Sequence, residues 1–232
     1  MAVKLGSALP EGDEKVRSVR AMFDAIAPRY DVVNRIMTFR MDVRWRRRTV
    51  RSLALPDDST VVDLACGTGD LCDELARCGY RPVGVDLSLG MLGAAHTTAP
   101  LVQADALRLS MPDASFDGAT CGFALRNFVA LEPFLASLAR IVRPGGRIAL
   151  LEVSTPRNRF LRWGHSIYFG HVVPRIGALL SDGAAYRYLP ESVAYLPESD
   201  ALLDMVGVAG FTDVQRTLLS AGIAQLITGT RA

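Results

Sequence analysis

The sequence lacks the features that mark a secreted, membrane-spanning or zinc-binding protein. Its four cysteines form no C-x-x-C pair and no two lie near a histidine at metal-ligand spacing, so we expect reduced thiols and no metal. No apolar run approaches the roughly 20 residues of a membrane-spanning helix, and the first fifteen residues contain no apolar core of a signal peptide. A formal net charge of only +2 gives no support for nucleic-acid binding. We expect a globular cytoplasmic protein, with peripheral contact with a membrane left open.

The chain divides into three kinds of segment. Residues 1–18 are polar and rich in charge, and we interpret them as a mobile N-terminal arm. Residues 19–232 form one domain that opens with a helical segment, 19–55, which Pro28 should break into at least two helices. Residues 155–200 are long, aromatic and interrupted by glycine and proline, which is typical of a functional insertion such as a substrate lid.

Between these segments, apolar strand patterns alternate with helical ones. Strands separated by helices predict a doubly wound α/β fold with a mostly parallel sheet. The last two patterns are separated by a short turn, so they predict an antiparallel hairpin at an edge of the sheet. The seven expected strands are 60–65, 81–88, 99–106, 115–125, 146–154, 211–219 and 222–230.

A glycine turn follows the first expected strand, in the stretch DLACGTGD. The turn lacks the third glycine of the dinucleotide fingerprint, whose place falls on Cys72, and it lacks the lysine of a phosphate-binding loop. Asp86 lies about 20 residues further on, where a carboxylate can accept both ribose hydroxyls of an adenosine. Asp105 and Ala106 follow the third strand, where a polar group could receive the adenine amino group. The pattern favours S-adenosylmethionine over NAD, because the turn is not built for a pyrophosphate.

Several longer motifs resemble a known family, the ubiquinone/menaquinone biosynthesis C-methyltransferases, which are class I S-adenosylmethionine-dependent methyltransferases. The resemblance covers nearly the whole chain after the arm. It implies a Rossmann-like class I fold and transfer of a methyl group to a ring carbon of a demethylated quinol. The motifs that carry it are DLACGTGD, GVDLSLGML, QADALRLSMPDASFD, YDVVNRIMTFRMDVRW, GFALRN, RIVRPGGRIALLEVS and YRYLPESV.

The sequence departs from the family pattern at a few positions. Asp42 stands where the family has histidine, Gly122 stands where a serine helps to hold the cofactor, and Gln225 and Ile227 replace the A-L-H motif. These departures keep open an alternative, a paralogous methyltransferase that acts on another phenolic or polyketide-derived secondary metabolite. A binding module that holds the cofactor without turnover is a further alternative, which the intact glycine turn and the Arg126–Asn127 pair oppose.

The resemblance and the motif positions together give a set of expected site residues. Arg126 and Asn127 are the catalytic candidates, because they follow the fourth strand, at the carboxyl edge of the sheet where such folds place ligands. Tyr30, His165 and Tyr188 are candidates for contact with the acceptor. The expected cofactor-binding residues are Ala65, Gly67, Thr68, Asp86, Leu87, Asp105, Ala106 and Gly122.

A run of arginines, RWRRRTVR, follows the first helices, and we expect it on a helix. Its charges share much of one face, which is either an ordinary solvated surface or a surface that docks on an anionic membrane. Docking would suit a prenylated acceptor, because the aromatic insertion could then form an apolar mouth. The expected partner is a small aromatic molecule, and a homo-oligomer is one option for the assembly. The residues that share this face are Arg40, Arg44, Arg47, Arg48 and Arg51.

Overall fold

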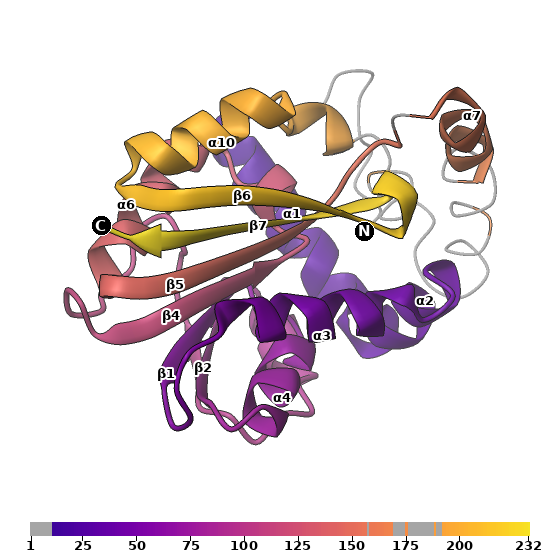
Figure 1. Ribbon diagram of the computed structural model, residues 1–232. Helices are drawn as coiled ribbons and strands as arrows, with labels where there is room; N and C mark the ends of the chain where they lie inside the picture. The colour runs from indigo at the N-terminus through magenta and orange to yellow at the C-terminus, as the bar shows by residue number, and fades with distance from the viewer. Residues whose placement is uncertain (1–10, 157, 169–174, 176–187, 189–191) are drawn as a thin grey trace.

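A seven-stranded sheet with the order β3-β2-β1-β4-β5-β7-β6 forms the centre of the molecule (Figure 1). The computed structural model describes residues 11–156, 158–168, 175, 188 and 192–232. Strands β3, β2, β1, β4 and β5 pair in parallel, and β7 is antiparallel to both β5 and β6. This arrangement confirms the expected doubly wound fold with its terminal antiparallel hairpin. The strands are β1 Thr60–Leu64, β2 Arg81–Asp86, β3 Leu101–Gln103, β4 Phe116–Gly122, β5 Val142–Val153, β6 Phe211–Leu219 and β7 Ala224–Arg231.

Helices cover both faces of the sheet, because neighbouring residues of each buried strand point to opposite faces. Val61 packs on the face covered by α3 and α4, whereas Val62 packs on the face covered by α6 and α10. Both residues have no exposed surface, as expected for strands inside a parallel sheet. The α-helices are α1 Gly12–Ile26, α2 Tyr30–Met37, α3 Met41–Leu53, α4 Asp70–Arg77, α5 Leu89–Gly93, α6 Leu131–Ile141, α7 Arg159–Ile167 and α10 Ser199–Val208. The 3-10 turns are η1 Ala27–Arg29, η2 Leu125–Asn127, η4 Ser192–Tyr195 and η5 Ser220–Gly222.

Helix α1 corrects the boundary expected for the N-terminal arm. It begins at Gly12, so residues 12–18 are helical, and Lys15 is buried with its Nζ donating to the carbonyl of Phe128 (2.7 Å). Two carboxylates in the first turn of α1 stabilise the positive end of the helix dipole. Charged residues alternate here with an apolar stripe, Val16, Val19 and Phe23, which faces the interior. Of the expected arm, residues 1–10 lie outside the described part of the chain.

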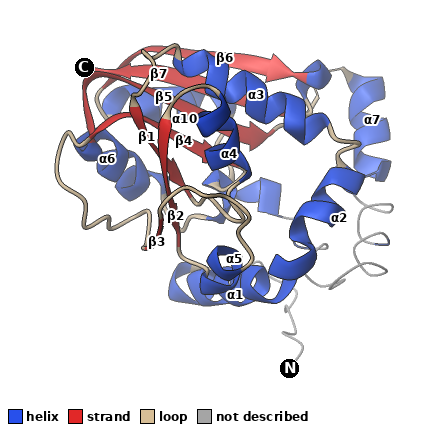
Figure 2. Cartoon of the chain, turned by 90° about the horizontal axis from the view of Figure 1, so that it is seen from below, coloured by secondary structure: helices blue, strands red, loops and turns tan. Residues whose placement is uncertain are grey.

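The helical segment that follows breaks at Pro28, as expected. Pro28 lies in η1, which joins α1 to α2, and α1, η1, α2 and α5 share a small apolar cluster of their own. Figure 2 shows α1 and α5 side by side, with α2 next to them. Helix α3 carries the arginine run, again as expected. No helix in the described residues is long and apolar enough to cross a membrane.

The expected insertion is described only at its start and end. It contains α7, and Tyr168, directly after that helix, donates its hydroxyl to the carbonyl of Met37 (2.8 Å). In both Figure 1 and Figure 2, α2 and α7 lie at the same end of the molecule. Strand β7 points away from that end in Figure 1, and β5 runs antiparallel to it, so the carboxyl ends of the parallel strands face α2 and α7.

Candidate active site

An open cavity lies at the carboxyl ends of the parallel strands. Loops after β1, β2, β3 and β4 line one side of it, where doubly wound folds bind their ligands. Seven of the eight expected cofactor residues line this single cavity: Ala65, Gly67, Asp86, Leu87, Asp105, Ala106 and Gly122.

The glycine turn brings bare backbone to the cavity wall. Gly67 has a φ of +57°, a conformation that glycine adopts without strain, and no atom lies within 4 Å of the place of a Cβ. Ala65 also has a positive φ, of +54°, which is uncommon for a residue with a side chain. A ligand can therefore approach the backbone at Gly67 closely.

Asp86 ends β2 and is tied to the glycine turn. The Gly67 N–H donates to Oδ2 of Asp86 (2.8 Å), and the Ser88 N–H donates to Oδ1 (2.8 Å). Burial raises the pKa of Asp86, and these two backbone hydrogen bonds act in the opposite direction because they favour the carboxylate. Each carboxylate oxygen has a second lone pair, so Asp86 can still accept hydroxyl groups from a ligand.

The loop after β3 forms another part of the wall. Oδ1 of Asp105 accepts the N–H of Leu107 (2.9 Å), a turn that fixes the carboxylate beside the buried Ala106. Asp105 and Ala106 thus lie at the cavity as the spacing predicted. The adjacent wall is apolar, with Leu87 and Met91 from the neighbouring loop and helix.

Thr68 is the expected cofactor residue that does not line the cavity. Its hydroxyl donates to Oδ1 of Asp31 (2.7 Å), and Thr68 is buried. The contact joins the glycine turn to the first turn of α2. Thr68 therefore anchors a helix in this structure, and sequence spacing could not show this because Asp31 lies 37 residues away.

Gly122 ends β4 on the cavity wall. A Cβ at this position would lie 2.8 Å from Cδ1 of Leu71, which belongs to α4. A side chain at residue 122 would therefore need a small shift of the end of the flexible Leu71 side chain.

Helix α1 supplies the wall that the sequence analysis missed. Val16, Val19, Arg20 and Phe23 line the cavity, and Phe23 packs edge-on against the ring of Tyr30 at 6.0 Å between centroids. Their spacing of three, four and seven residues is an amphipathic pattern that could have revealed the helix. The cavity is thus enclosed between the sheet loops and the N-terminal helix.

Arg126 is held in a buried ion pair with Glu152 of β5. Its NH1 also donates to the carbonyl of Phe123 (2.8 Å), and its Nε donates to the hydroxyl of Ser192 (3.1 Å). The backbone N–H of Arg126 donates to Oε2 of the same Glu152 (3.2 Å). The guanidinium therefore binds protein groups and joins η2, β5 and η4, and Arg126 itself does not line the cavity.

Asn127 and Tyr30 do line the cavity, and Tyr188 lies beside Asn127. The Tyr188 hydroxyl donates to Oδ1 of Asn127 (3.3 Å), and Tyr188 is buried. Burial raises the pKa of Tyr30, while the nearby guanidinium groups of Arg46 and Arg126 lower it. The fifth candidate, His165, lies on α7, but its side chain is outside the described part of the structure.

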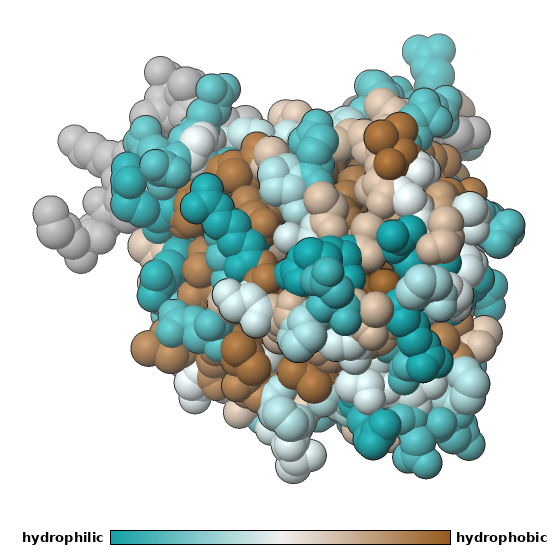
Figure 3. All heavy atoms as spheres, turned by 90° about the vertical axis from the view of Figure 1, so that its left-hand side faces the viewer, coloured by the Kyte–Doolittle hydropathy of each residue, from teal (hydrophilic) through white to brown (hydrophobic). Residues whose placement is uncertain are grey.

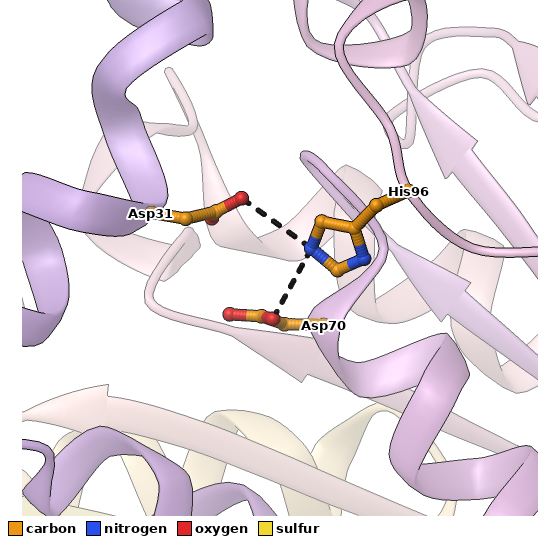
Figure 4. Close-up of side chains that lie close together, drawn as sticks. All are labelled: Asp31, Asp70 and His96. Atoms are coloured by element: carbon orange, nitrogen blue, oxygen red, sulfur yellow. Dashed lines mark ion pairs between the residues drawn. The ribbon is translucent and has the colours of Figure 1, made fainter.

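Three possible metal ligands, Asp31, Asp70 and His96, meet beside the glycine turn, and their spacing in the sequence does not predict this (Figure 4). Nε2 of His96 lies 3.4 Å from a carboxylate oxygen of Asp31 and 3.4 Å from one of Asp70. Both oxygens of Asp70 already bind guanidinium groups, of Arg35 at 2.9 Å and of Arg46 at 3.1 Å. Because these two positive charges would repel a metal ion, the site does not favour metal binding. The cluster acts as an ion-pair network that joins α2, α3 and α4.

The departure at Asp42 belongs to the same network. Asp42 is fully buried, forms an ion pair with Arg46 one turn later in α3, and accepts the hydroxyl of Thr38 (2.6 Å). Arg46 is also buried, so the arginine run contains one inward residue among exposed ones. The exposed residues are the five that the sequence analysis grouped, and Arg47 lies 3.7 Å from Glu74.

A model of the ubiE/COQ5 methyltransferase family matches residues 11–231 of the chain. Two relatives are named demethylmenaquinone methyltransferase, one from Deinococcus radiodurans and one from Thermus thermophilus. The first is 40% identical over 234 residues, covering 96% of this chain and 97% of the relative, and the second is 41% identical over 220 residues, covering 90% and 100%. A third, the ubiquinone/menaquinone biosynthesis C-methyltransferase UbiE of Syntrophotalea carbinolica, is 41% identical over 225 residues, covering 93% and 95%.

Solved structures of methyltransferases share the fold. A methyltransferase from Thermotoga maritima, described as S-adenosylmethionine-dependent and a possible histamine N-methyltransferase, superposes with a TM-score of 0.64 at 20% identity, covering 92% of this chain and 99% of that one. The phosphoethanolamine N-methyltransferase 2 of Haemonchus contortus, solved with S-adenosylmethionine, gives 0.57 at 12% identity, covering 79% and 52%. At these identities the likeness shows the fold.

Proposed function

The chain belongs to the ubiE/COQ5 methyltransferase family, and from this premise we propose that it methylates a ring carbon of a demethylated quinol such as demethylmenaquinol. The protein is an S-adenosylmethionine-dependent methyltransferase with a class I fold. Its curated relatives carry names from quinone biosynthesis over nearly the full length of this chain. The acceptor is therefore a small aromatic quinone precursor.

The observation that carries the proposal is the Asp86 carboxylate at the wall of the cavity, fixed to the glycine turn at Gly67. The donor set fits S-adenosylmethionine, because a carboxylate can accept both ribose hydroxyls and open backbone at Gly67 admits an adenosine closely. The cavity wall also contains Asp105, so the potential favours a cationic ligand over a phosphate.

When bound, the cofactor supplies a methyl group on a cationic sulfur that an electron-rich ring carbon can attack. The chain must align the acceptor and favour loss of its hydroxyl proton, and alignment alone contributes about 7–11 kcal/mol in favourable cases. Asn127 is the group on the wall that can orient the ring oxygen, with its own amide held by Tyr188. Tyr30 closes the opposite side, beside α1.

Arg126 takes a positioning role in this proposal. Its guanidinium is satisfied by Glu152, Phe123 and Ser192, and these contacts hold η2, the turn that contains Asn127. The positive charge lies behind the cavity wall. Burial raises the pKa of Tyr30, and the Arg126 charge partly opposes that rise. The same charge would lower the pKa of an acceptor hydroxyl at the cavity. Removing the side chain should therefore displace Asn127 as well as change the local potential.

An apolar rim flanks the cavity at the end of the molecule formed by α2 and α7, and we propose that it contacts the membrane that holds a prenylated acceptor. The rings of Phe39 and Tyr168 lie 5.6 Å apart and join the two helices. Arg40 directly follows Phe39 and is exposed, so one basic group lies beside the apolar surface, where it favours an anionic membrane. The opposite side of the molecule mixes hydrophilic and hydrophobic residues (Figure 3). The rim consists of Val32, Ile36, Phe39, Phe160, Trp163 and Ile167, which are 40–85% exposed.

The deciding experiment is a transfer assay with labelled S-adenosylmethionine and a short-chain demethylmenaquinol under reducing conditions, with the product's mass and methyl position determined. We expect a C-methylated quinol from the wild type and little from Asp86→Ala at limiting cofactor. A wild type that binds S-adenosylhomocysteine but leaves the quinol unmethylated would contradict the acceptor. The search would then move to other phenolic rings.

A further inference from the structure

Asp24, on α1, contacts the loop that follows β2. Its Oδ1 accepts the hydroxyl of Ser88 (2.5 Å) and the N–H of Gly90 (2.9 Å). Its ion pair with Arg20, at 3.9 Å, is long and exposed, and such pairs contribute little. The contacts to the loop are therefore the main interactions of this carboxylate.

Ser88 connects Asp24 to Asp86. Its backbone N–H donates to Oδ1 of Asp86 (2.8 Å), its hydroxyl donates to Asp24, and the same hydroxyl accepts the N–H of Met91 (3.0 Å). All three groups fix one orientation of Ser88, which is buried. Two carboxylates repel each other at short range, so hydrogen bonds through Ser88 must hold this arrangement together. The position of Asp86 thus depends on a residue of α1.

The same contact seats α1 over the cavity. A Cβ at Gly90 would lie 2.7 Å from the Cα of Asp24, so α1 and α5 touch at a distance that only glycine permits. At the other end of α1, Lys15 donates to Phe128 and its ammonium lies 3.4 Å from the ring centre of Tyr195. The helix is therefore fixed at two points, and its residues between them line the cavity.

We propose that Asp24 is a positioning residue for the cofactor: it orients Asp86 through Ser88 and holds α1 against the cavity. The inference rests on the proposed use of S-adenosylmethionine. The N-terminal helix thereby contributes to the affinity for the adenosine moiety. The position of α1 over the cavity and the binding of the cofactor are then linked through one side chain, that of Asp24.

The test measures the affinity for S-adenosylhomocysteine by calorimetry, which needs no acceptor. We expect Asp24→Ala to weaken binding about tenfold or more, because hydrogen bonds that involve a charged group are among the stronger ones. Asp24→Asn keeps an acceptor oxygen and should recover most of the affinity. Asp13→Asn, which removes the same charge from an exposed place on α1, is the matched control and should bind as the wild type does.

A double-mutant cycle separates positioning from general loss of structure. If Asp24 acts through Ser88, then Asp24→Ala/Ser88→Ala should bind about as weakly as either single variant. Hydrogen exchange of residues 12–26 gives a second readout: S-adenosylhomocysteine should protect α1 in the wild type and less in saturated Asp24→Ala. Thermal unfolding checks that each variant folds. If Asp24→Ala does not fold, Ser88→Ala alone tests the link between Asp24 and Asp86.

Two results would overturn the inference. In the first, Asp24→Ala binds S-adenosylhomocysteine as tightly as the wild type; in the second, the effects of the two substitutions multiply independently. Failure of the underlying function looks different, because the wild type itself would then not bind S-adenosylhomocysteine.

Discussion

Arg126 and Glu152 form an ion pair that is almost fully shielded from solvent and joins η2 to the end of β5. Loss of one partner from a buried pair leaves the other charge uncompensated, which typically costs about 3–5 kcal/mol. The pair therefore determines the position of the turn that contains Asn127. It also explains why the arginine of the GFALRN motif cannot be treated as a free catalytic cation.

We expect Arg126→Met to lower the free energy of unfolding by about 3–5 kcal/mol, measured by urea denaturation. The double variant Arg126→Met/Glu152→Gln should be more stable than the single one, because no buried charge is then left unpaired. A direct catalytic role for Arg126 predicts another pattern, in which Arg126→Met keeps normal stability and loses only turnover. Normal stability of this variant would contradict the ion-pair interpretation.

The sequence predicted the parts of the site that depend on local order along the chain. The glycine turn and Asp86 lie at the carboxyl ends of consecutive strands, so alternation of strands and helices was sufficient to bring them together. Glu152 could not be assigned to Arg126, because the pair joins η2, which follows β4, to β5, and β4 and β5 become neighbours only in the folded sheet. The contact of Thr68 with Asp31 could not be foreseen for the same reason, because Asp31 belongs to a helix whose docking the sequence does not specify.

The boundary of α1 shows a different limit. The helical spacing of Val16, Val19 and Phe23 was present in the sequence, but Asp13, Glu14 and Lys15 made the segment resemble a solvated arm. Lys15 is buried because its ammonium finds a carbonyl and an aromatic ring, and burial lowers its pKa to about 8. Such a tertiary partner overrides the usual preference of lysine for the surface.

Asp86→Ala should weaken S-adenosylhomocysteine binding by at least about tenfold, since it removes the acceptor for both ribose hydroxyls. Its effect on stability should be smaller, because Gly67 and Ser88 line the cavity, where water can replace the lost acceptor oxygens. Calorimetry measures the affinity, and Asp58→Asn, an exposed aspartate before β1, is the matched control. Equal affinity of Asp86→Ala and wild type would show that the ribose binds elsewhere.

Asp63, near the end of β1, should make the stability depend on pH. Burial raises its pKa to about 7, although the hydroxyl of Thr120 donates to it at 2.7 Å and partly offsets the shift. The unfolded chain releases this proton near pH 4, whereas the folded chain keeps it until about pH 7. The contribution of Asp63 to stability is therefore greatest below pH 4, falls between pH 4 and 7, and stays reduced above pH 7.

Asp63→Asn should remove this dependence while its amide oxygen keeps the hydrogen bond from Thr120. The measurement is the free energy of unfolding in urea at pH 5 and pH 8 for both proteins. We expect the variant to gain stability relative to the wild type as the pH rises. A constant difference between the two proteins across this range would mean that Asp63 does not titrate there.

The apolar rim of α2 and α7 should determine how the protein binds to vesicles. Phe39 is 71% exposed and Trp163 is 69% exposed, so Phe39→Ser/Trp163→Ser removes large apolar groups with little cost to the core. We expect this variant to lose most of its cosedimentation with vesicles of phosphatidylglycerol and phosphatidylcholine. Its KM should rise for a long-chain demethylmenaquinol in those vesicles and stay unchanged for a short-chain acceptor in solution. This split separates the rim from the catalytic cavity.

Val208→Ser is the matched control for the rim, because Val208 is 90% exposed on α10, which covers another part of the sheet. It removes an exposed apolar side chain without changing the end that contains α2 and α7. Arg40 beside the rim adds a salt-dependent term of about 1 kcal/mol near an anionic surface, so binding should weaken at high salt and in vesicles without phosphatidylglycerol. If Val208→Ser and the rim variant lose vesicle binding equally, the attraction is unspecific and the rim has no special part in it. If only the rim variant loses binding, the rim is the membrane contact, and we infer that the acceptor enters from the side of α2 and α7. Its ring would then reach Tyr30 and Asn127, the group proposed to orient the ring oxygen.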